Sequence, residues 1–241
     1  MEIARGAYTI AGTAVLPLLP LRLWWRGRRE PGYRHAIGER FGRYDAVAGV
    51  GTTLWIHAVS VGETRAAAPL IERLSGTFPH ARILLTHMTA TGRDTGRALF
   101  GDRVTQAWLP YDLPFAVRAF LGHFRPRAGF LMETELWPNL IAHAHAQQVP
   151  LFLINARLSP RSAARYARVG ALTRPMLGRL TGVAAQSAAD AERLTALGAP
   201  SGTITGNLKF DIAVPEAMRA LGRSLRPNAR PAWWRAGGSL N

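Results

Sequence analysis

The 241-residue sequence contains no cysteine and a single lysine, Lys209. Without cysteine the chain has no disulfide bond, no zinc site with thiolate ligands and no cysteine nucleophile. Basic residues, nearly all of them arginines, number 30 against 15 acidic residues, which gives a formal net charge of +15. Such a charge attracts nucleic acid, an anionic bilayer or a phosphorylated substrate. A coding bias toward arginine explains the arginine content equally well.

A concentrated basic stripe is also lacking. The arginines are spread along the chain, with no dense run beyond Arg26–Arg29, whereas nucleic-acid binders more often concentrate basic residues and interleave aromatic ones. We therefore expect no nucleic-acid partner. There is no P-loop, no nucleophile elbow and no G-x-G-x-x-G after a strand, so nicotinamide chemistry has no support. The histidines show no metal-ligand spacing, since His143 and His145 cannot share a helix face.

An uncharged segment runs from Gly6 to Leu21, and tryptophans and an arginine cluster follow it. The run is shorter than the ~20 residues that span a bilayer, but it approaches that length at Trp25 if Arg22 snorkels to the head groups. Tryptophans beside arginines suit a membrane interface, and the arginines place the following domain on the cytoplasmic side. We expect an uncleaved membrane anchor helix, spanning or monotopic, with its basic flank over residues 1–29.

Two other structures are compatible with an apolar N-terminal segment. A cleaved signal peptide would carry its charge before the apolar run and small residues after it, whereas here the stronger charge and two bulky tryptophans follow the run. A buried core helix is disfavoured by Pro17 and Pro20. The sequence therefore favours the anchor.

Beyond a glycine-rich connector at residues 30–52, apolar β-branched runs alternate with segments of helical periodicity. The strand candidates are Leu54–Val61, Arg82–His87, Val104–Leu109, Gly129–Met132, Leu151–Asn155 and Gly182–Gln186, with a final strand or loop at Thr203–Asn207. The helix candidates are 65–76, 91–100, 114–123, 136–147, 160–179 and 188–197. Near-continuous apolar strands in regular β-then-α order predict a parallel sheet buried on both faces. We expect an α/β fold with a doubly wound, Rossmann-like domain over residues 53–211.

Polar residues gather where the predicted strands end, which is where doubly wound sheets bind ligands. Ser60, Gly62 and Glu63 follow the first strand, in the turn before a helix. Gly62 permits a tight turn, and the helix N-terminus should keep Glu63 ionised. An ionised carboxylate at a cleft can accept a proton from an attacking hydroxyl, which makes Glu63 a candidate general base. Helix capping is the alternative, and the pattern alone favours it.

A second acidic motif follows the fourth predicted strand. Glu133 and Glu135 bracket Thr134 before a helix opens at Trp137. Carboxylates in a strand-to-helix turn can bind sugar hydroxyls, a metal or arginines. Helix capping is again the alternative that the pattern alone favours.

Six segments together resemble the 3-deoxy-D-manno-octulosonic acid (Kdo) transferase family, in the family's order and at its approximate spacing. They are LWIHAVSVGE (54–63), LLTHMTATG (84–92), LPYDLP (109–114), METELWPN (132–139), INARLSPRS (154–162) and GNLKFD (206–211). The apolar N-terminal segment, its basic flank and ERFG (39–42) also match. A single such motif is weak evidence, whereas six collinear motifs are highly specific.

The resemblance implies a GT-B glycosyltransferase, in which two Rossmann-like domains face each other across a cleft. It implies that the N-terminal domain binds the acceptor, a phosphorylated and acylated glucosamine disaccharide that is a lipid A precursor. The C-terminal domain binds the donor, CMP-Kdo. Transfer then inverts the anomeric configuration, without a catalytic metal or another cofactor, at the cytoplasmic face of the bacterial inner membrane in lipopolysaccharide biosynthesis.

The resemblance also implies roles for single residues. Glu63 matches the family's proposed general base, and Glu133 and Glu135 inherit a supporting role in substrate binding. Ser60 and Gly62 belong to the same segment as Glu63 and are expected to adjoin the substrate.

The turn INARLSPRS supplies a further set of candidates. Arg157, Arg161 and Ser162 can donate hydrogen bonds there, and we expect them to bind the acceptor phosphates. A family member should continue for roughly another domain beyond GNLKFD, whereas residues 212–241 read as a linker and a truncated or frame-shifted tail with a helix candidate near 215–224. The alternative function is a catalytically inactive, membrane-associated acceptor-binding module.

Overall fold

The computed structural model of the chain describes residues 2–45, 51–211, 220 and 224. The chain divides into two units, Met1–Asp211 and Ile212–Asn241, and the fold presented below is that of the first unit. The linker and tail expected at 212–241, with the helix candidate near 215–224, lie outside the described residues except for positions 220 and 224.

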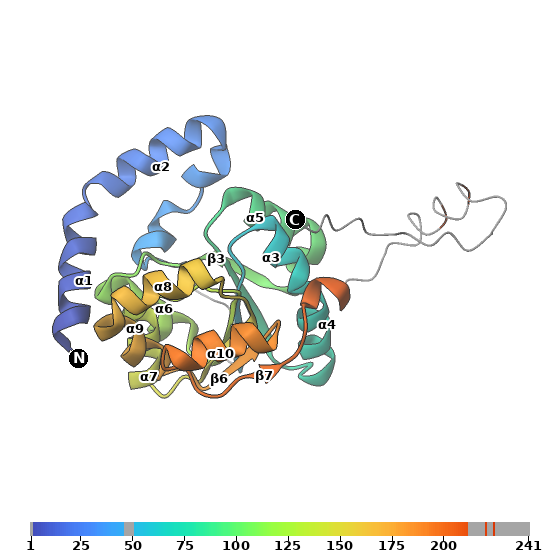
Figure 1. Ribbon diagram of the computed structural model, residues 1–241. Helices are drawn as coiled ribbons and strands as arrows, with labels where there is room; N and C mark the ends of the chain where they lie inside the picture. Colours follow the sequence, from blue (N-terminus) through green and yellow to red (C-terminus); the bar gives the residue numbers. More distant parts are fainter. Residues whose placement is uncertain (1, 46–50, 212–219, 221–223, 225–241) are drawn as a thin grey trace. The chain divides into compact units, whose positions relative to one another are not determined.

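A sheet of seven parallel strands, in the order β3-β2-β1-β4-β5-β6-β7, forms the centre of the first unit (Figure 1). The strands are β1 (Thr53–His57), β2 (Arg82–His87), β3 (Thr105–Trp108), β4 (Pro126–Met132), β5 (Leu151–Ala156), β6 (Gly182–Ala185) and β7 (Thr203–Ile204). The central strand β1 is buried along its whole length, as a strand covered by helices on both faces must be. The predicted parallel α/β sheet is confirmed.

Helices cover both faces of this sheet (Figure 1). One face carries α3 (Val61–Ala66), α4 (Ala68–Thr77) and α5 (Ala90–Phe100). The other face carries α6 (Pro114–Phe124), α7 (Pro138–Ala146), α8 (Pro160–Arg168), α9 (Gly170–Leu177) and α10 (Ala188–Ala196). Alternate side chains of β1 divide between the two layers, since Trp55 packs with α6 and Ile56 packs with the residues of α3 to α5. Short 3-10 helices lie at η3 (Gly101–Arg103) and η4 (Leu208–Asp211).

The winding of the chain reverses between β1 and β4. Strands β2 and β3 lie to one side of β1, whereas β4 and all later strands lie to the other. The parallel register places His57 of β1 beside Leu131 of β4. The turns that follow these two strands therefore emerge next to each other, at the point where doubly wound sheets bind ligands.

Two helices, α1 (Glu2–Val15) and α2 (Leu18–Arg29), precede the sheet and are bent by 58° relative to each other. The N-terminal segment, expected as one helix, is therefore two helices: the chain breaks at Pro17, whose ring and missing N–H interrupt a helix. None of the described helices is by itself long and apolar enough to cross a membrane, whereas the bent pair taken together has the required length and composition. The connector then forms η1 (Pro31–Arg34) and η2 (Ile37–Phe41).

Helix α1 contacts α7 and α9, and its contacts with α7 include hydrogen bonds between polar side chains. Arg5 Nη1 and Thr9 Oγ1 both donate to Asn139 Oδ1, at 3.3 Å and 3.1 Å. The apolar residues Ile3 and Ile10 of the same helix are 87% and 73% exposed. The polar side of α1 thus faces the protein and the apolar side faces outward, the reverse of an ordinary surface helix.

Several boundaries differ from the predicted ones, and the helix expected over 65–76 is two helices, α3 and α4, which meet at Ala67. The first strand was expected to run to Val61, but it ends at His57 because Ser60 caps α3. The helix expected over 160–179 is two helices, which meet at Val169 and Gly170.

Candidate active site

Glu63 lies in the first turn of α3, where Ser60 is the N-cap residue. Ser60 Oγ accepts from the Glu63 amide at 3.4 Å and donates to Glu63 Oε1 at 2.7 Å. The Val59 amide donates to Glu63 Oε2 at 2.9 Å. This reciprocal arrangement resembles a capping box. Glu63 therefore makes the helix-capping contacts that the sequence analysis gave as the alternative to a catalytic role. Each carboxylate oxygen still keeps a lone pair for a further hydrogen bond.

Burial raises the pKa of Glu63 above its ordinary value, although hydrogen bonds from Val59 and Ser60 oppose the rise; the charge of Glu133 adds to it. The sequence-based expectation of an ionised Glu63 considered the helix N-terminus but not the loss of solvation that penalises the charged form. A raised pKa makes the ionised carboxylate a stronger proton acceptor. Gly62 lies beside Glu63 in the first turn of α3.

Glu133 follows β4 with a left-handed backbone, at φ 57°. Its amide donates to the carbonyl of Ile154 in the neighbouring strand at 2.9 Å. Residues other than glycine adopt this conformation at a cost, and such positions concentrate at functional sites. The Glu133 carboxylate lies 3.3 Å from Lys209 Nζ.

Glu135 has a pKa raised to about 7. Burial is the largest cause, the charges of Glu63 and Glu133 add to it, and the Trp137 side chain opposes it. Carboxylates influence one another in this way only when they lie close together. The parallel register of β1 and β4 sets the turns after these strands side by side, in agreement with this mutual influence. We call Glu63, Glu133 and Glu135, from the acidic motifs in these two turns, the carboxylate cluster.

Lys209 is a member of this site that the sequence did not assign. The segment that carries it is held in place by Asn155, whose Oδ1 accepts from the Leu208 amide at 3.1 Å. Asn155 itself has a left-handed backbone, at φ 50°. The sequence did contain a signal for a role of Lys209. It is the one lysine among arginines, and it lies inside the GNLKFD motif.

The residues of the INARLSPRS turn lie at the start of α8. Ser159 caps this helix and accepts from the Ser162 amide at 3.2 Å. Arg157 and Arg161 are exposed, and among the described residues neither forms an ion pair with the carboxylate cluster. Helix α8 nevertheless adjoins the cluster, because burial and then the charge of Glu135 raise the pKa of Tyr166. Both arginines are thus available to an anionic ligand.

Two buried histidines end the strands beside the cluster, but they carry no charge at neutral pH. Burial lowers the pKa of His57 to about 3 and that of His87 to about 4. Within the described part of the chain, no group of three or more histidine, aspartate or glutamate side chains could hold a metal ion. Both histidine side chains are also fully buried, at 0% exposure, so a substrate cannot reach them, and the carboxylates are the candidate proton acceptors here.

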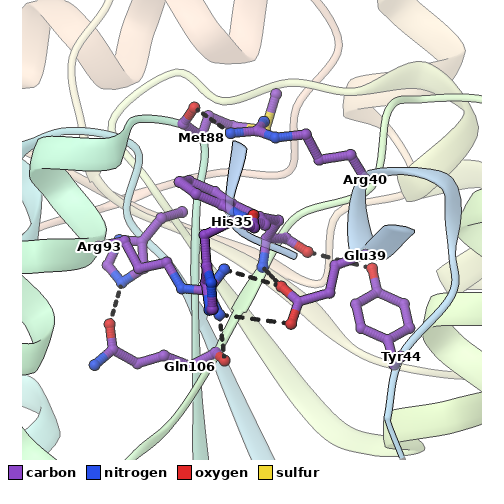
Figure 2. A network of polar contacts seen from close by, with 9 residues as sticks. His35, Glu39, Arg40, Tyr44, Met88, Arg93 and Gln106 are labelled. Atoms are coloured by element: carbon purple, nitrogen blue, oxygen red, sulfur yellow. Dashed lines mark hydrogen bonds and ion pairs between the residues drawn. The ribbon is translucent and has the colours of Figure 1, made fainter. Parts of the chain in front are cut away.

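A buried polar network connects the connector helix η2 to the loop that follows β2 (Figure 2). Glu39 accepts from Arg93 Nη1 at 3.1 Å and from the Trp108 amide at 2.7 Å. Arg40 donates to the carbonyl of Met88 at 3.3 Å and its guanidinium lies 3.9 Å from the centre of the Trp108 ring. The network fixes the position of residue 88 and of the start of α5.

That loop in turn contacts the segment that holds Glu63. Thr89 Oγ1 donates to the carbonyl of Val59 at 2.6 Å. A Cβ atom on Gly92 would lie only 2.7 Å from the same carbonyl, so a glycine is required for this close approach. Val59 thus binds Glu63 through its amide N–H and is held through its carbonyl by Thr89, in the TATG turn at residues 89–92.

Comparison with known proteins shows which family has a similar sequence. A family model described as "3-Deoxy-D-manno-octulosonic-acid transferase (kdotransferase)" matches residues 35–212. The chain is 46% identical over 231 residues to a 3-deoxy-D-manno-octulosonic acid transferase of Bordetella pertussis, a match that covers 92% of this chain and 53% of the relative. A transferase of the same name from Haemophilus influenzae is 39% identical over 211 residues, covering 85% of this chain and 49% of the relative. The chain thus spans about half the length of the curated relatives it matches.

Among solved structures, the chain is similar to UDP-GlcNAc 2-epimerase from Neisseria meningitidis bound to UDP-GlcNAc, with a TM-score of 0.51 at 14% identity. The similarity covers 73% of this chain and 54% of that protein. At so low an identity it supports the fold alone.

Proposed function

The chain belongs to the 3-deoxy-D-manno-octulosonic acid (Kdo) transferase family, and from this premise we propose that it is the acceptor-binding half of a GT-B Kdo transferase. The acceptor is a lipid A precursor, the donor is CMP-Kdo, and the reaction belongs to lipopolysaccharide biosynthesis. The donor site belongs to the half of the relatives that this chain does not match. The observation that carries the proposal is the carboxylate cluster at the switch point of the sheet.

Glu63 acts as the general base of an inverting displacement. A hydroxyl oxygen of the acceptor attacks the anomeric carbon of Kdo while the bond to the CMP phosphate breaks, and CMP leaves with the electron pair. The hydroxyl proton passes to Glu63. Ser60 and the Val59 amide hold the carboxylate in place by hydrogen bonds at 2.7 Å and 2.9 Å, and its free lone pairs accept from the substrate.

The other members of the cluster bind the acceptor. Glu135, with a pKa of about 7, can donate or accept a hydrogen bond to a sugar hydroxyl at neutral pH. Glu133 stands next to it, paired with Lys209 at 3.3 Å. Arg157, Arg161 and Ser162 bind the acceptor phosphates, for which exposed arginines at the start of α8 are suited.

We further propose that α1 and α2 attach the protein to the cytoplasmic face of the bacterial inner membrane. Support comes from exposed apolar and aromatic side chains, among them Ile3, Leu21 and Trp25 with exposed fractions of 87%, 61% and 63%. The arginines that end α2 suit anionic lipid head groups.

The proposal is tested by transfer of Kdo when the chain is co-expressed with the donor-binding half of the Bordetella pertussis relative. Glu63→Gln should lower the transfer rate by about 10²–10⁴-fold, the usual contribution of a general base, and should leave acceptor binding intact. The matched control is Glu72→Gln, since Glu72 lies on the surface in an exposed ion pair with Arg103. Activity of Glu63→Gln within a few-fold of the parent would move the base to Glu133 or Glu135.

A second candidate is a catalytically inactive, membrane-associated acceptor-binding module. The observation in its favour is that Ser60 and the Val59 amide give Glu63 helix-capping contacts, which account for its position without a catalytic role. This candidate predicts acceptor binding without transfer even when the donor-binding half is supplied, so the same co-expression assay separates the two.

A further inference from the structure

A hollow of about 360 Å³ lies between α1 and the loop that follows β3. Its walls include Ala11, Val15 and Leu19 from the N-terminal helices and Leu113 and Trp137 from the α/β domain. This volume falls within the range of ordinary small-molecule pockets, which are mostly apolar. The hollow is therefore large enough for part of a ligand.

Among the polar groups at this hollow, the Asp112 carboxylate is already occupied by the protein, whereas Tyr111 Oη and Trp137 Nε1 are buried without a hydrogen-bond partner among the described residues. Asp112 accepts from the amides of Asn139 and Leu140 at 2.9 Å and 2.7 Å, and these amides begin α7. The Tyr8 hydroxyl also donates to this carboxylate. These contacts hold the carboxylate between α1 and α7. The surface left to a ligand is mainly that of the apolar residues Ala11, Val15, Leu19 and Leu113, and the polar atoms that remain on it are the Tyr111 hydroxyl and the Trp137 N–H.

One wall of the hollow adjoins the candidate active site. Trp137 lines the hollow and lies two positions after Glu135, whose pKa its side chain influences. A molecule that places a sugar hydroxyl in the carboxylate cluster therefore has the hollow within reach of its substituents.

The side of the hollow formed by the helices is continuous with exposed apolar residues. Val15 is 48% exposed, and Leu18 and Leu21 are each 61% exposed. Arg26, Arg28 and Arg29 occupy the last turn of α2. An apolar surface with arginines at its end complements a lipid that has apolar chains and an anionic head group.

We infer that this hollow, between α1 and the Leu109–Pro114 loop, binds one acyl chain of the acceptor while the sugar of the same molecule lies in the carboxylate cluster. The inference rests on the proposed function for the identity of the acceptor. It assigns α1 a part in substrate recognition as well as in membrane attachment. A second apolar hollow of about 650 Å³, lined by Pro17, Pro20 and Phe41 among others, shares no residue with the carboxylate motifs, and we assign it no ligand.

Two glycines of α1 provide a matched pair of variants. A Cβ atom on Gly12 meets Leu113 Cδ2 at 3.6 Å, an ordinary contact, and Gly12 lines the hollow. A Cβ atom on Gly6 meets nothing within 4 Å. Gly12→Leu should thus fill the hollow, and Gly6→Leu adds the same side chain to the same helix away from it. Ala11→Phe, at an exposed position that also lines the hollow, is a second filling variant in case Gly12→Leu does not fold.

The experiment labels the full chain with a photoreactive saturated fatty acid below its micelle concentration and maps the labelled peptides by mass spectrometry. We expect labelling of the peptides that contain Val15, Leu113 and Trp137. This labelling should be lost in Gly12→Leu or Ala11→Phe and kept in Gly6→Leu. Equal labelling of these peptides in all variants, or labelling confined to Ile3 and Ile10, would overturn the inference.

Competition separates this inference from the proposed function. The phosphorylated, acylated glucosamine disaccharide should displace the fatty acid, and its deacylated form should not, although the deacylated form should still bind the chain. Binding of both disaccharides without any labelling of the hollow would refute the acyl-chain site and leave the proposed acceptor in place. Labelling of the hollow that neither disaccharide affects, with no binding of either, would refute the proposed acceptor and with it the assigned ligand.

Discussion

At the scale of single residues, Glu63 shows that a cap and a catalytic base are compatible roles. Its carboxylate accepts from Ser60 and Val59, which fixes the side chain rotamer and the helix start together. The same contacts use one lone pair of each oxygen and leave the others free. A sequence pattern cannot separate the two roles, because both require the same residue at the same position of the first turn.

Glu135 provides a prediction about pH and stability. Its pKa is about 7 in the folded chain against about 4.3 for an unperturbed glutamate. Between these values the folded state holds a proton that the unfolded state releases, so this group lowers the free energy of unfolding as the pH rises through the window. Glu135→Gln removes the penalty, and its stabilising effect should be larger at pH 8 than at pH 5 by about 2 kcal/mol.

Urea unfolding of parent and variant at the two pH values measures this difference. Glu192→Gln, at an exposed position on α10, is the control and should show no such change between the two pH values. An equal effect of Glu135→Gln at pH 5 and pH 8 would mean that the carboxylate is not buried beside other charges.

Lys209 yields a second prediction at this scale. Its side chain is 47% exposed and that of Glu133 is 30% exposed, and ion pairs of this kind contribute only about 0–1 kcal/mol to stability. Lys209→Gln should therefore change the free energy of unfolding by less than about 1 kcal/mol, yet weaken binding of the phosphorylated acceptor. Calorimetric titration with the acceptor measures the second effect, and unchanged affinity would restrict Lys209 to a structural role.

At the scale of secondary structure, local patterns predicted the elements better than their ends. The apolar runs placed six of the strands, because strands buried on both faces have no polar alternation to obscure them. The first strand was predicted to be too long, since Ala58 and Val61 are as apolar as the strand before them and only the capping contact of Ser60 ends it. The break between α8 and α9 at Val169 was also missed, because no proline marks it.

Contacts between residues far apart in the chain could not be predicted from the sequence, for a different reason. The pairing of Glu39 with Arg93 and that of Asn155 with Leu208 join segments 54 and 53 positions apart, and no local pattern encodes such contacts. The approach of Lys209 to Glu133 spans 76 positions. The motifs contain all of these residues except Arg93, but they do not indicate which of them meet.

The network of Glu39 supplies a prediction for the connector helix η2. Glu39 and Arg93 have side-chain exposures of only 16% and 7%, and removing one partner of such a pair leaves a buried charge unpaired. Glu39→Gln should destabilise the fold by about 3 kcal/mol. Combining it with Arg93→Met should cost less than the sum of the two single changes, because the unpaired charge is then absent.

Thermal or urea unfolding of the single and double variants measures this coupling. The ion pair of Arg103 with Glu72 is the control: its contact is shorter, at 2.7 Å, but its side chains are 60% and 56% exposed. Glu72→Gln should therefore cost less than about 1 kcal/mol. Additive effects of the Glu39 and Arg93 substitutions would show that the network does not act as a unit.

At the scale of the whole molecule, the order of elements was sufficient to predict the doubly wound sheet, and the switch point followed from the strand order. β1 and β4 are neighbours only because β2 and β3 turn to one side and β5 to the other. This topology brings the acidic motifs together although 70 positions separate Glu63 from Glu133. The N-terminal region was less predictable, since hydropathy reports apolar length but not the bend at Pro17.

The bend leads to a final prediction, about how the molecule meets a membrane. Helices α1 and α2 have 14 and 12 residues, so each is only about 20 Å long, against a hydrocarbon core of about 30 Å. A spanning arrangement would have to pull Arg5 and Thr9 away from Asn139, whereas an interfacial one keeps these contacts and buries Ile3 and Ile10 in lipid. We therefore expect both helices to lie in the interface, on the same side of the bilayer as the α/β domain. Because the chain has no cysteine, a single Glu2→Cys substitution at the start of α1 reports this directly on vesicles that carry the domain outside. A membrane-impermeant maleimide should label Cys at this position without detergent, because the start of α1 then lies on the same side as the domain. Labelling that appears only after the vesicles are permeabilised would establish a span instead.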